Sequence, residues 1–125
     1  MPTPTEIAVR TYVATWQEPD RGVRARMIEA CFAEDGRIVS RGAELRGRAA
    51  LAAAMDEFFA DPRGLSARIV SAIDAKGSTF RFRALTVHGD GSTLAEVFDA
   101  GLVDADGRIA LILTFAGLLA EPDTV

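Results

Sequence analysis

The spacing of apolar residues changes once along the chain, near residue 65, and this change constrains the fold more than any other feature. Before it, apolar residues recur at three- and four-residue spacing, which is typical of amphipathic helices. After it, turn clusters separate four strand-like segments rich in Ile, Val, Phe, Thr and Leu: 66–75, 79–88, 93–103 and 108–119. We therefore predict an α+β domain with helices on one face of a curved antiparallel sheet. A chain of 125 residues has the length of one domain, so a single domain is expected over 1–125.

Start and stop signals divide the first half into three predicted helices. Thr3 and Asp20 are residue types that accept hydrogen bonds from first-turn amides, and a glycine precedes the third helix. The expected helices lie within the segments Thr3 to Pro19, Asp20 to Gly36 and Gly47 to Gly64. A short strand at 37–40 and a loop at 41–47 are expected between the second and third helices. The predicted order is α-α-β-α-β-β-β-β.

Composition and charge exclude several classes of protein. The net charge of −4 and the absence of basic runs argue against nucleic-acid binding. One cysteine, Cys31, and one histidine cannot supply a metal site, and no glycine-rich phosphate loop follows a strand, so no metal and no cofactor are expected. The longest apolar stretch, 109–120, is too short to cross a bilayer, and no basic-then-apolar leader opens the chain. We expect a cytoplasmic protein with no membrane partner.

The turn at Asp90-Gly91 predicts which side chains of the last strands share a face. In a two-residue hairpin, residues equidistant from the turn lie opposite each other, so Phe82 faces Asp99. With a two- or four-residue loop at the next turn, one face carries Phe82, Ala84, Thr86, His88, Val97, Asp99, Gly101, Ile112, Thr114, Ala116 and Leu118. The opposite face carries Arg81, Arg83, Leu85, Val87, Leu94, Glu96, Phe98, Leu102, Leu111, Leu113 and Phe115.

Asp99 is the most informative residue of the first face. It lies among small residues, which predict open space beneath the helices rather than a filled core: Ala84, Gly101, Thr114 and Ala116. An ionised carboxylate in apolar surroundings is unfavourable unless it is paired or performs a task. We expect a cavity between the first helix, the third helix and the sheet, with Tyr12, Phe82, Asp99 and Thr114 on its wall.

The second face is large and apolar, apart from Arg83 and Glu96, which lie close enough to pair. Three helices can cover only one face of such a sheet, and exposed apolar patches above a few hundred Å² are rare in monomers. We therefore predict a homodimer through this outer face, with Phe98 and Phe115 in the interface.

At this point the chain resembles the NTF2-like superfamily, in particular its SnoaL-like and ketosteroid-isomerase-like branch. The element order supports the resemblance, as do five short motifs: Tyr12 with Trp16, Phe32-Ala33-Glu34-Asp35, Arg46-Gly47, Phe98-Asp99, and Asp106-Gly107-Arg108-Ile109. The resemblance implies a cone-shaped fold, with the helices on the concave face of the sheet. Proteins of this family are often dimers through the outer face.

The resemblance also implies roles for individual residues. Asp99 matches the pocket aspartate that donates to the substrate oxyanion in ketosteroid isomerases, and Tyr12 matches its tyrosine partner. Ser40 stands where those enzymes have the general-base aspartate. In SnoaL-type aldol cyclases the strand aspartate is the acid and base and has a histidine neighbour, a place that His88 fits loosely. Relatives of limonene-epoxide hydrolase need an arginine where this chain has Val97, so that activity is disfavoured.

The leading hypothesis is a cofactor-independent isomerase, cyclase or lyase that acts on a small apolar carbonyl compound. Its predicted catalytic residues are Asp99, Tyr12 and His88. The predicted ligand-binding residues are Trp16, Ser40, Phe58, Phe82, Ala84, Thr86, Val97, Thr114 and Ala116. A core tyrosine remains the alternative reading of Tyr12, and a solvated turn histidine that of His88. A non-catalytic ligand-binding module and a dimeric interaction domain with a vestigial pocket are the alternative functions.

Overall fold

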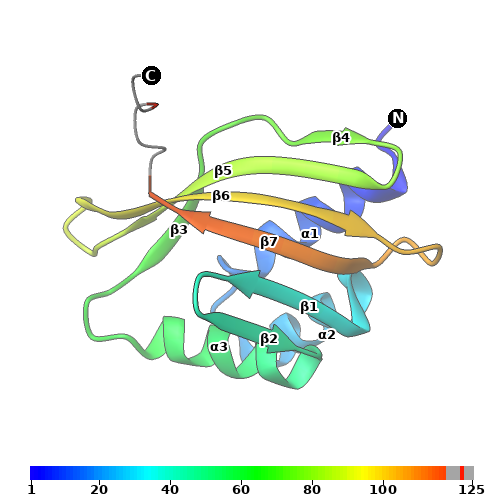
Figure 1. Cartoon of the computed structure of the whole chain (residues 1–125). Helices are drawn as coiled ribbons and strands as arrows, with labels where there is room; N and C mark the ends of the chain where they lie inside the picture. The colour runs from blue at the N-terminus through cyan, green and yellow to red at the C-terminus, as the bar shows by residue number, and fades with distance from the viewer. Residues whose placement is uncertain (118–121, 123–125) are drawn as a thin grey trace.

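A computed structural model describes residues 1–117 and 122, and its helices and strands follow the predicted α+β order (Figure 1). The helices are α1 (Pro4–Thr15), α2 (Arg21–Cys31) and α3 (Arg48–Ala60). The strands are β1 (Phe32–Ser40), β2 (Ala43–Arg46), β3 (Ser66–Ile69), β4 (Asp74–Lys76), β5 (Thr79–Val87), β6 (Thr93–Val103) and β7 (Ile109–Ala116). The predicted strand residues beyond 117, including Leu118, lie outside the described part of the chain.

Local capping explains where the helices begin. The Thr3 hydroxyl accepts a hydrogen bond from the Glu6 amide at 3.1 Å at the start of α1. Asp20 accepts one from the Val23 amide at 2.9 Å at the start of α2. Both predicted caps are therefore confirmed. Gly47 precedes α3 at a φ of 89°, a backbone conformation that residues with a Cβ rarely adopt.

The sheet is mixed rather than purely antiparallel, which corrects the prediction. Its strand order is β2-β1-β7-β6-β5-β3, and β4 also pairs with β5. Every pairing is antiparallel except that of β1 with β7. The direction of β1 follows from α2, which ends at Cys31 and passes into the strand at Phe32 without a loop. Hydrophobic alternation reports which residues are buried but not which way a strand runs, so the sequence could not reveal this pairing.

Three segments of the predicted sheet also differ from the structure. The expected loop at 41–47 is a hairpin, in which β2 returns along β1 after a turn at Gly42 with a φ of 75°. The first strand begins at Phe32 rather than at residue 37, since Phe32 already pairs with Ile109 of β7. The predicted strand at 66–75 is divided into β3 and β4.

The predicted face assignment holds through most of the last three strands, but Val87, predicted on the outer face, follows a register shift and is buried. Pairs equidistant from Asp90-Gly91, such as Phe82 with Asp99, continue from Thr79 to Thr86. The connection itself is longer than a two-residue turn, because a register shift follows Thr86 and the next strand begins at Thr93. Across the next turn Asp99 lies opposite Thr114, so the central residues of the first face stay together.

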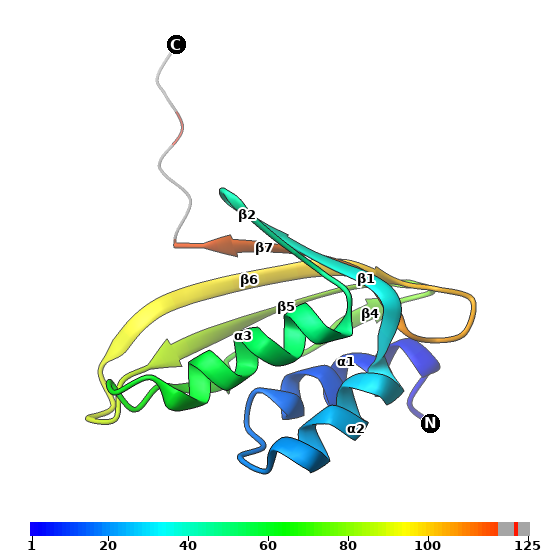
Figure 2. The same ribbon diagram turned by 90° about the horizontal axis from the view of Figure 1, so that it is seen from below.

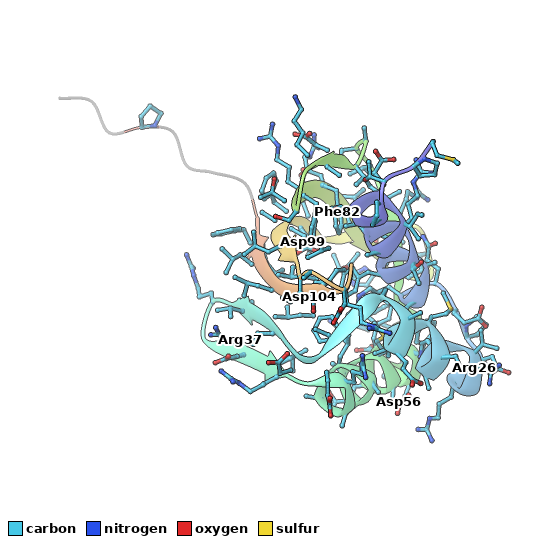
Figure 3. All side chains as sticks on the ribbon, turned by 90° about the vertical axis from the view of Figure 1, so that its right-hand side faces the viewer. Arg26, Arg37, Asp56, Phe82, Asp99 and Asp104 are labelled. Carbon is cyan, nitrogen blue, oxygen red and sulfur yellow. The ribbon has the colours of Figure 1, made fainter. Side chains whose placement is uncertain are left out.

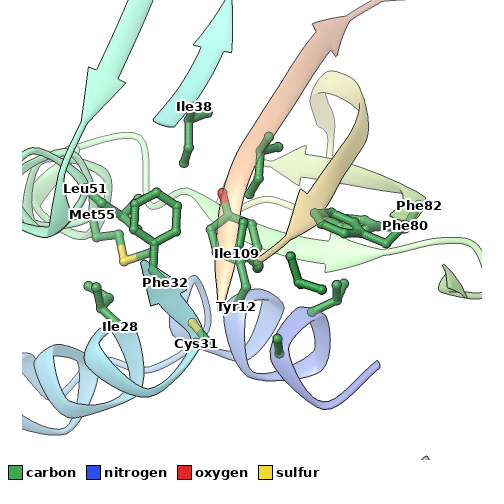
Figure 4. Close-up of a cluster of buried hydrophobic side chains, with 14 residues drawn as sticks. Tyr12, Ile28, Cys31, Phe32, Ile38, Leu51, Met55, Phe80, Phe82 and Ile109 are labelled. Atoms are coloured by element: carbon green, nitrogen blue, oxygen red, sulfur yellow. The ribbon is translucent and has the colours of Figure 1, made fainter. Parts of the chain in front are cut away.

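All three helices lie on one side of the curved sheet (Figure 2). The main core forms between these layers from buried side chains of both, including Tyr12, Phe32, Leu51, Met55, Phe82 and Ile109 (Figure 4). None of the three helices in the described part of the chain covers the opposite face. Its exposed apolar side chains include Leu94, Leu102, Leu113 and Phe115, the last with 57% of its surface accessible. Arg83 and Glu96 pair on this face at 2.9 Å, as predicted.

Arg24 of α2 holds α3 against α2. Its guanidinium is buried, binds the Asp56 carboxylate of α3 at 2.7 Å and lies 4.4 Å from the centre of the Phe59 ring. It also donates to the Glu18 carbonyl at 2.8 Å. Because a buried charge is stable only when it is paired, these contacts tie α3 to α2 and to the segment that precedes α2.

Gly101 does not border open space, which corrects part of the sequence interpretation. A Cβ built on it would lie 2.7 Å from the Phe80 ring and 2.1 Å from the Leu111 carbonyl oxygen. Phe80 is the cross-strand partner of Gly101 and packs its ring over the glycine. The small residue here makes room for an aromatic ring of the core rather than for a ligand.

We expect Gly101→Ala to destabilise the protein by about 2 kcal/mol or more, because overpacking forces side chains and backbone to shift. Backbone atoms at the Leu111 carbonyl cannot move without disturbing the pairing of β6 with β7. Urea unfolding measures the change, and Gly91→Ala at an exposed turn with no atom near its Cβ is the matched control. Gly91 has a φ of 89°, so its own cost is backbone strain of about 1 kcal/mol. An equal loss in both variants would contradict the packing explanation.

Candidate active site

A cavity of about 300 Å³ opens between α1, α3 and the concave face of the sheet. Its walls are almost entirely apolar. All but two of the predicted site residues line it: Tyr12, Trp16, Ser40, Phe58, Phe82, Ala84, Thr86, Val97, Asp99 and Thr114. The cavity therefore gathers residues from α1, α3, β1, β5, β6 and β7, which hydrophobic spacing alone had placed in separate elements.

Asp99 occupies the middle of β6, between two cross-strand neighbours that differ in chemistry. Phe82 of β5 lies on one side and Thr114 of β7 lies on the other. Figure 3 shows Asp99 and Phe82 next to each other on the sheet. Only 7% of Asp99 is exposed, although a carboxylate normally seeks water. The register of the three strands thus carries the carboxyl group into the apolar interior.

Burial raises the pKa of Asp99 to about 6, and the hydrogen bond from Thr114 opposes this rise. The Thr114 hydroxyl donates to Oδ1 of the carboxyl at 2.7 Å. Burial dominates because a charged carboxylate loses more hydration than one hydroxyl restores. Near neutral pH the group can therefore both release and accept a proton, as a general acid or base must.

Tyr12 of α1 is a second ionisable residue that lines the cavity. Its side chain is buried, and burial together with the nearby charge of Asp99 raises its pKa above the usual range for a phenol. The phenol therefore stays protonated at neutral pH and can donate a hydrogen bond but cannot act as a base. Its ring meets Trp16 edge to face at 6.5 Å, and Trp16 meets Phe58 at 5.2 Å. These rings form an apolar wall around the polar groups.

The structure does not bring His88 or Ala116 to the cavity. The register shift after Thr86 takes His88 out of the alternation of β5, and its Nδ1 lies 2.9 Å from the Ser92 hydroxyl in the following turn. Ala116 is exposed at the end of β7. A two-residue turn would have kept His88 in phase, but no feature of the sequence announces the shift. Ser40, by contrast, does line the cavity at the end of β1.

Sequence reasoning missed lining residues from the short strands, and it placed Leu85 of β5, which also borders the cavity, on the outer face. Leu45 of β2 and Ala67 and Ile69 of β3 contribute to the wall. Ala67 and Ile69 are alternate residues, so strand alternation could have placed both on one face once the partner of β3 was known. Leu45 lies in a segment whose composition gives no strand signal. Arg68 also borders the cavity, and its side chain is exposed.

Metal and membrane signals are also absent from the described residues. Within residues 1–117 and 122, no three His, Cys, Asp or Glu side chains are placed to hold a metal ion. None of the helices in that part of the chain has the length and hydrophobicity to cross a membrane.

Asp99→Asn is expected to stabilise the folded protein at pH 8 but not at pH 3. The folded-state pKa of Asp99, about 6, lies above its ordinary value of 3.8, so the folded wild type holds its proton more tightly than the unfolded chain. The free energy of unfolding of the wild type is therefore highest below about pH 4 and falls as the pH rises through 6. The shift in the pKa of Asp99 corresponds to a loss of about 3 kcal/mol between these two pH ranges. Urea unfolding of both proteins across this range measures it, and parallel pH profiles would contradict it.

The chain matches the SnoaL-like domain family over residues 9–112 and belongs to that family. This confirms the resemblance to the NTF2-like superfamily. No curated protein sequence matches the chain. Among solved structures, a proposed isomerase of the SnoaL-like family from Agrobacterium tumefaciens is 24% identical, with a TM-score of 0.81 over 93% of this chain and 99% of its own.

Two more distant structures share the same fold. A proposed polyketide cyclase from Sinorhizobium meliloti is 18% identical, with a TM-score of 0.66 over 86% of this chain and 92% of its own. An LEH-like epoxide hydrolase of M. tuberculosis is also 18% identical, with a TM-score of 0.67 over 91% of this chain and 83% of its own. At these identities the likeness establishes the fold alone.

Proposed function

We propose that this SnoaL-like protein is a cofactor-independent acid–base enzyme that acts on a small apolar carbonyl compound. The observation that carries the proposal is Asp99, a buried carboxyl group with a pKa of about 6 on the wall of an apolar cavity. Catalytic acids and bases have pKa values close to the working pH, and clefts are where such perturbed groups concentrate.

The surroundings of Asp99 suit proton transfer next to a carbonyl group. The carboxylate would take a proton from the carbon beside the carbonyl, and the protonated Tyr12 phenol would donate a hydrogen bond to the oxygen on which charge develops. The neutral acid would then return the proton to carbon, which balances the step without a second carboxylate. Ser40, whose hydroxyl is no base at neutral pH, agrees with this single-carboxyl scheme. His88 has no part in it.

The names of two structural neighbours, an isomerase and a polyketide cyclase, agree with this class of reaction. The scheme requires a ligand without a negative charge near Asp99, because two anions in an apolar cavity repel each other. An apolar ketone, enone or lactone meets that requirement and fits walls built from aromatic and aliphatic side chains.

Proton exchange tests the proposal before the natural substrate is known. A panel of apolar ketones, enones and lactones is incubated with the protein in D2O, and NMR follows the loss of hydrogen beside the carbonyl. Exchange that depends on Asp99 supports the enzyme. Compounds that raise the melting temperature without exchanging or turning over would instead favour the non-catalytic ligand-binding module.

We also propose that two copies associate through the outer face of the sheet. Leu94, Leu102, Leu113 and Phe115 are exposed there, and Phe98 lies beside Phe115 with ring centres 6.4 Å apart. No helix of the described chain covers these side chains (Figure 2). Two-fold pairing would bring the same face of each copy together and remove the apolar area from water.

A further inference from the structure

The two carboxylate oxygens of Asp99 have different surroundings. Oδ1 accepts the hydrogen bond from the Thr114 hydroxyl at 2.7 Å. Within the described part of the chain, Oδ2 has no hydrogen-bond partner. Every fully buried polar side-chain atom in that part of the chain does have one. Oδ2 is therefore not enclosed, and because Asp99 lines the cavity, this second oxygen faces the cavity.

The strand register explains why only one oxygen is held. Asp99 has Thr114 directly opposite it on β7 and Phe82 directly opposite it on β5. Side chains in such positions touch, but the Phe82 ring offers no hydrogen-bond donor. The branched side chain of Thr114 also has few rotamers, so the direction of its hydroxyl is restricted. A donor is thus available on one side of the carboxyl only.

We infer, resting on the proposed function, that Thr114 is a positioning residue that keeps Oδ1 as an acceptor and leaves Oδ2 as the atom that exchanges the proton. In the neutral acid the proton lies on Oδ2, because the Thr114 hydroxyl already donates to Oδ1. In the carboxylate, the same hydroxyl stabilises the charge while Oδ2 remains open to the substrate. Thr114 itself takes no proton from the substrate.

Among residues 1–117 and 122, no other charged group in the cavity offers an equivalent control. From the elements around Asp99, the remaining titratable side chains that these residues place on the wall are Tyr12 of α1 and Arg68 of β3. The Tyr12 phenol stays neutral, and the Arg68 side chain is exposed. The lining residues of α3, β1 and β2 are not titratable, namely Phe58, Ile38, Ser40 and Leu45. Changes at Thr114 therefore act on Asp99 against a constant electrostatic background.

Three substitutions separate the hydroxyl of Thr114 from its bulk. Thr114→Val keeps the shape and removes the donor, Thr114→Ala removes donor and bulk, and Thr114→Ser keeps the donor but loses the methyl group. The side-chain carboxyl carbon of Asp99, followed by 13C NMR, reports the titration in each protein. We expect the pKa to rise from about 6 by roughly 1 pH unit in the Val and Ala variants and to stay in place in the Ser variant.

The series decides between a donor and a packing effect. A pKa that moves alike in the Ser and Ala variants, or stays unchanged in a folded Val variant, would overturn the inference. Should the Val variant fail to fold, the Ser and Ala pair still decides. The titration needs no substrate, so a wild type that catalyses no exchange would contradict only the proposed function. With a substrate in hand, the Val variant should lower kcat more than it changes KM, and Ser should restore the wild-type pH profile.

Discussion

Asp99→Asn lowers kcat by about 10²-fold or more if the proposed chemistry is correct, the range that general acid–base catalysis contributes. The amide keeps the size of the carboxyl, and its oxygen can still accept the hydrogen bond from Thr114. It cannot take up or release a proton at neutral pH. Ligand binding should therefore survive while turnover and proton exchange are lost. Steady-state kinetics and a thermal-shift titration with the same ligand measure the two properties separately.

A matched variant guards against a general effect of removing a carboxylate. Asp35 is exposed in β1 and lies outside the cavity, so Asp35→Asn makes the same chemical change where no role is proposed. Its activity should equal that of the wild type. An Asp99→Asn protein that keeps more than a tenth of the wild-type kcat would exclude Asp99 as the acid and base.

Leu113→Glu converts the proposed dimer into monomers. Leu113 lies in β7 between Ala100 of β6 and Val39 of β1, near the middle of the outer face, and 39% of it is exposed in the single chain. Burying its carboxylate against the apolar face of a second copy, without a partner charge, costs about 3–5 kcal/mol. The dissociation constant should rise at least about 100-fold. Sedimentation velocity at micromolar concentration measures the change.

Ile7→Glu provides the control for this experiment. Ile7 is an exposed apolar residue of α1, on the helical side of the molecule, with 53% of its surface accessible. The same charge there should leave the dimer intact. A wild type that sediments as a monomer, or an Ile7→Glu variant that dissociates as readily as Leu113→Glu, would contradict an interface on the outer face.

Local sequence patterns predicted the features that depend on near neighbours. Caps at Thr3 and Asp20 and the change of apolar spacing predicted the helices and the α+β order, because these signals act within a few residues. The face shared by Phe82, Asp99 and Thr114 also followed from the sequence. Side chains alternate strictly along a strand, so one well-placed turn assigns the faces of its neighbours.

Features that depend on distant contacts were not predicted. The pairing of β1 with β7, and the Phe80 ring over Gly101, exist only once the sheet has formed. His88 lies outside the cavity because of a register shift after Thr86, and no residue type in the sequence specifies this shift. β2 lies within the predicted loop, and Ala43-Glu44-Leu45-Arg46 has no β-branched or aromatic residue to indicate a strand. Within the site, most residues of the long strands were therefore predicted, whereas Ile38, Leu85 and the residues of the short strands were not.

The parallel contact between β1 and β7 has a consequence for how the chain folds. Ile38 pairs with Ile112, so the first strand finds its neighbour about 70 residues later in the sequence. Until that neighbour is in place, β1 and β2 form an isolated hairpin, which is marginally stable in water. The entropy of closing so long a loop is lost before the contacts between the two strands can offset it. Folding is therefore expected to be slow and cooperative. The cavity takes Ser40 from one of these strands and Thr114 from the other, so its wall is complete only when both strands are in place.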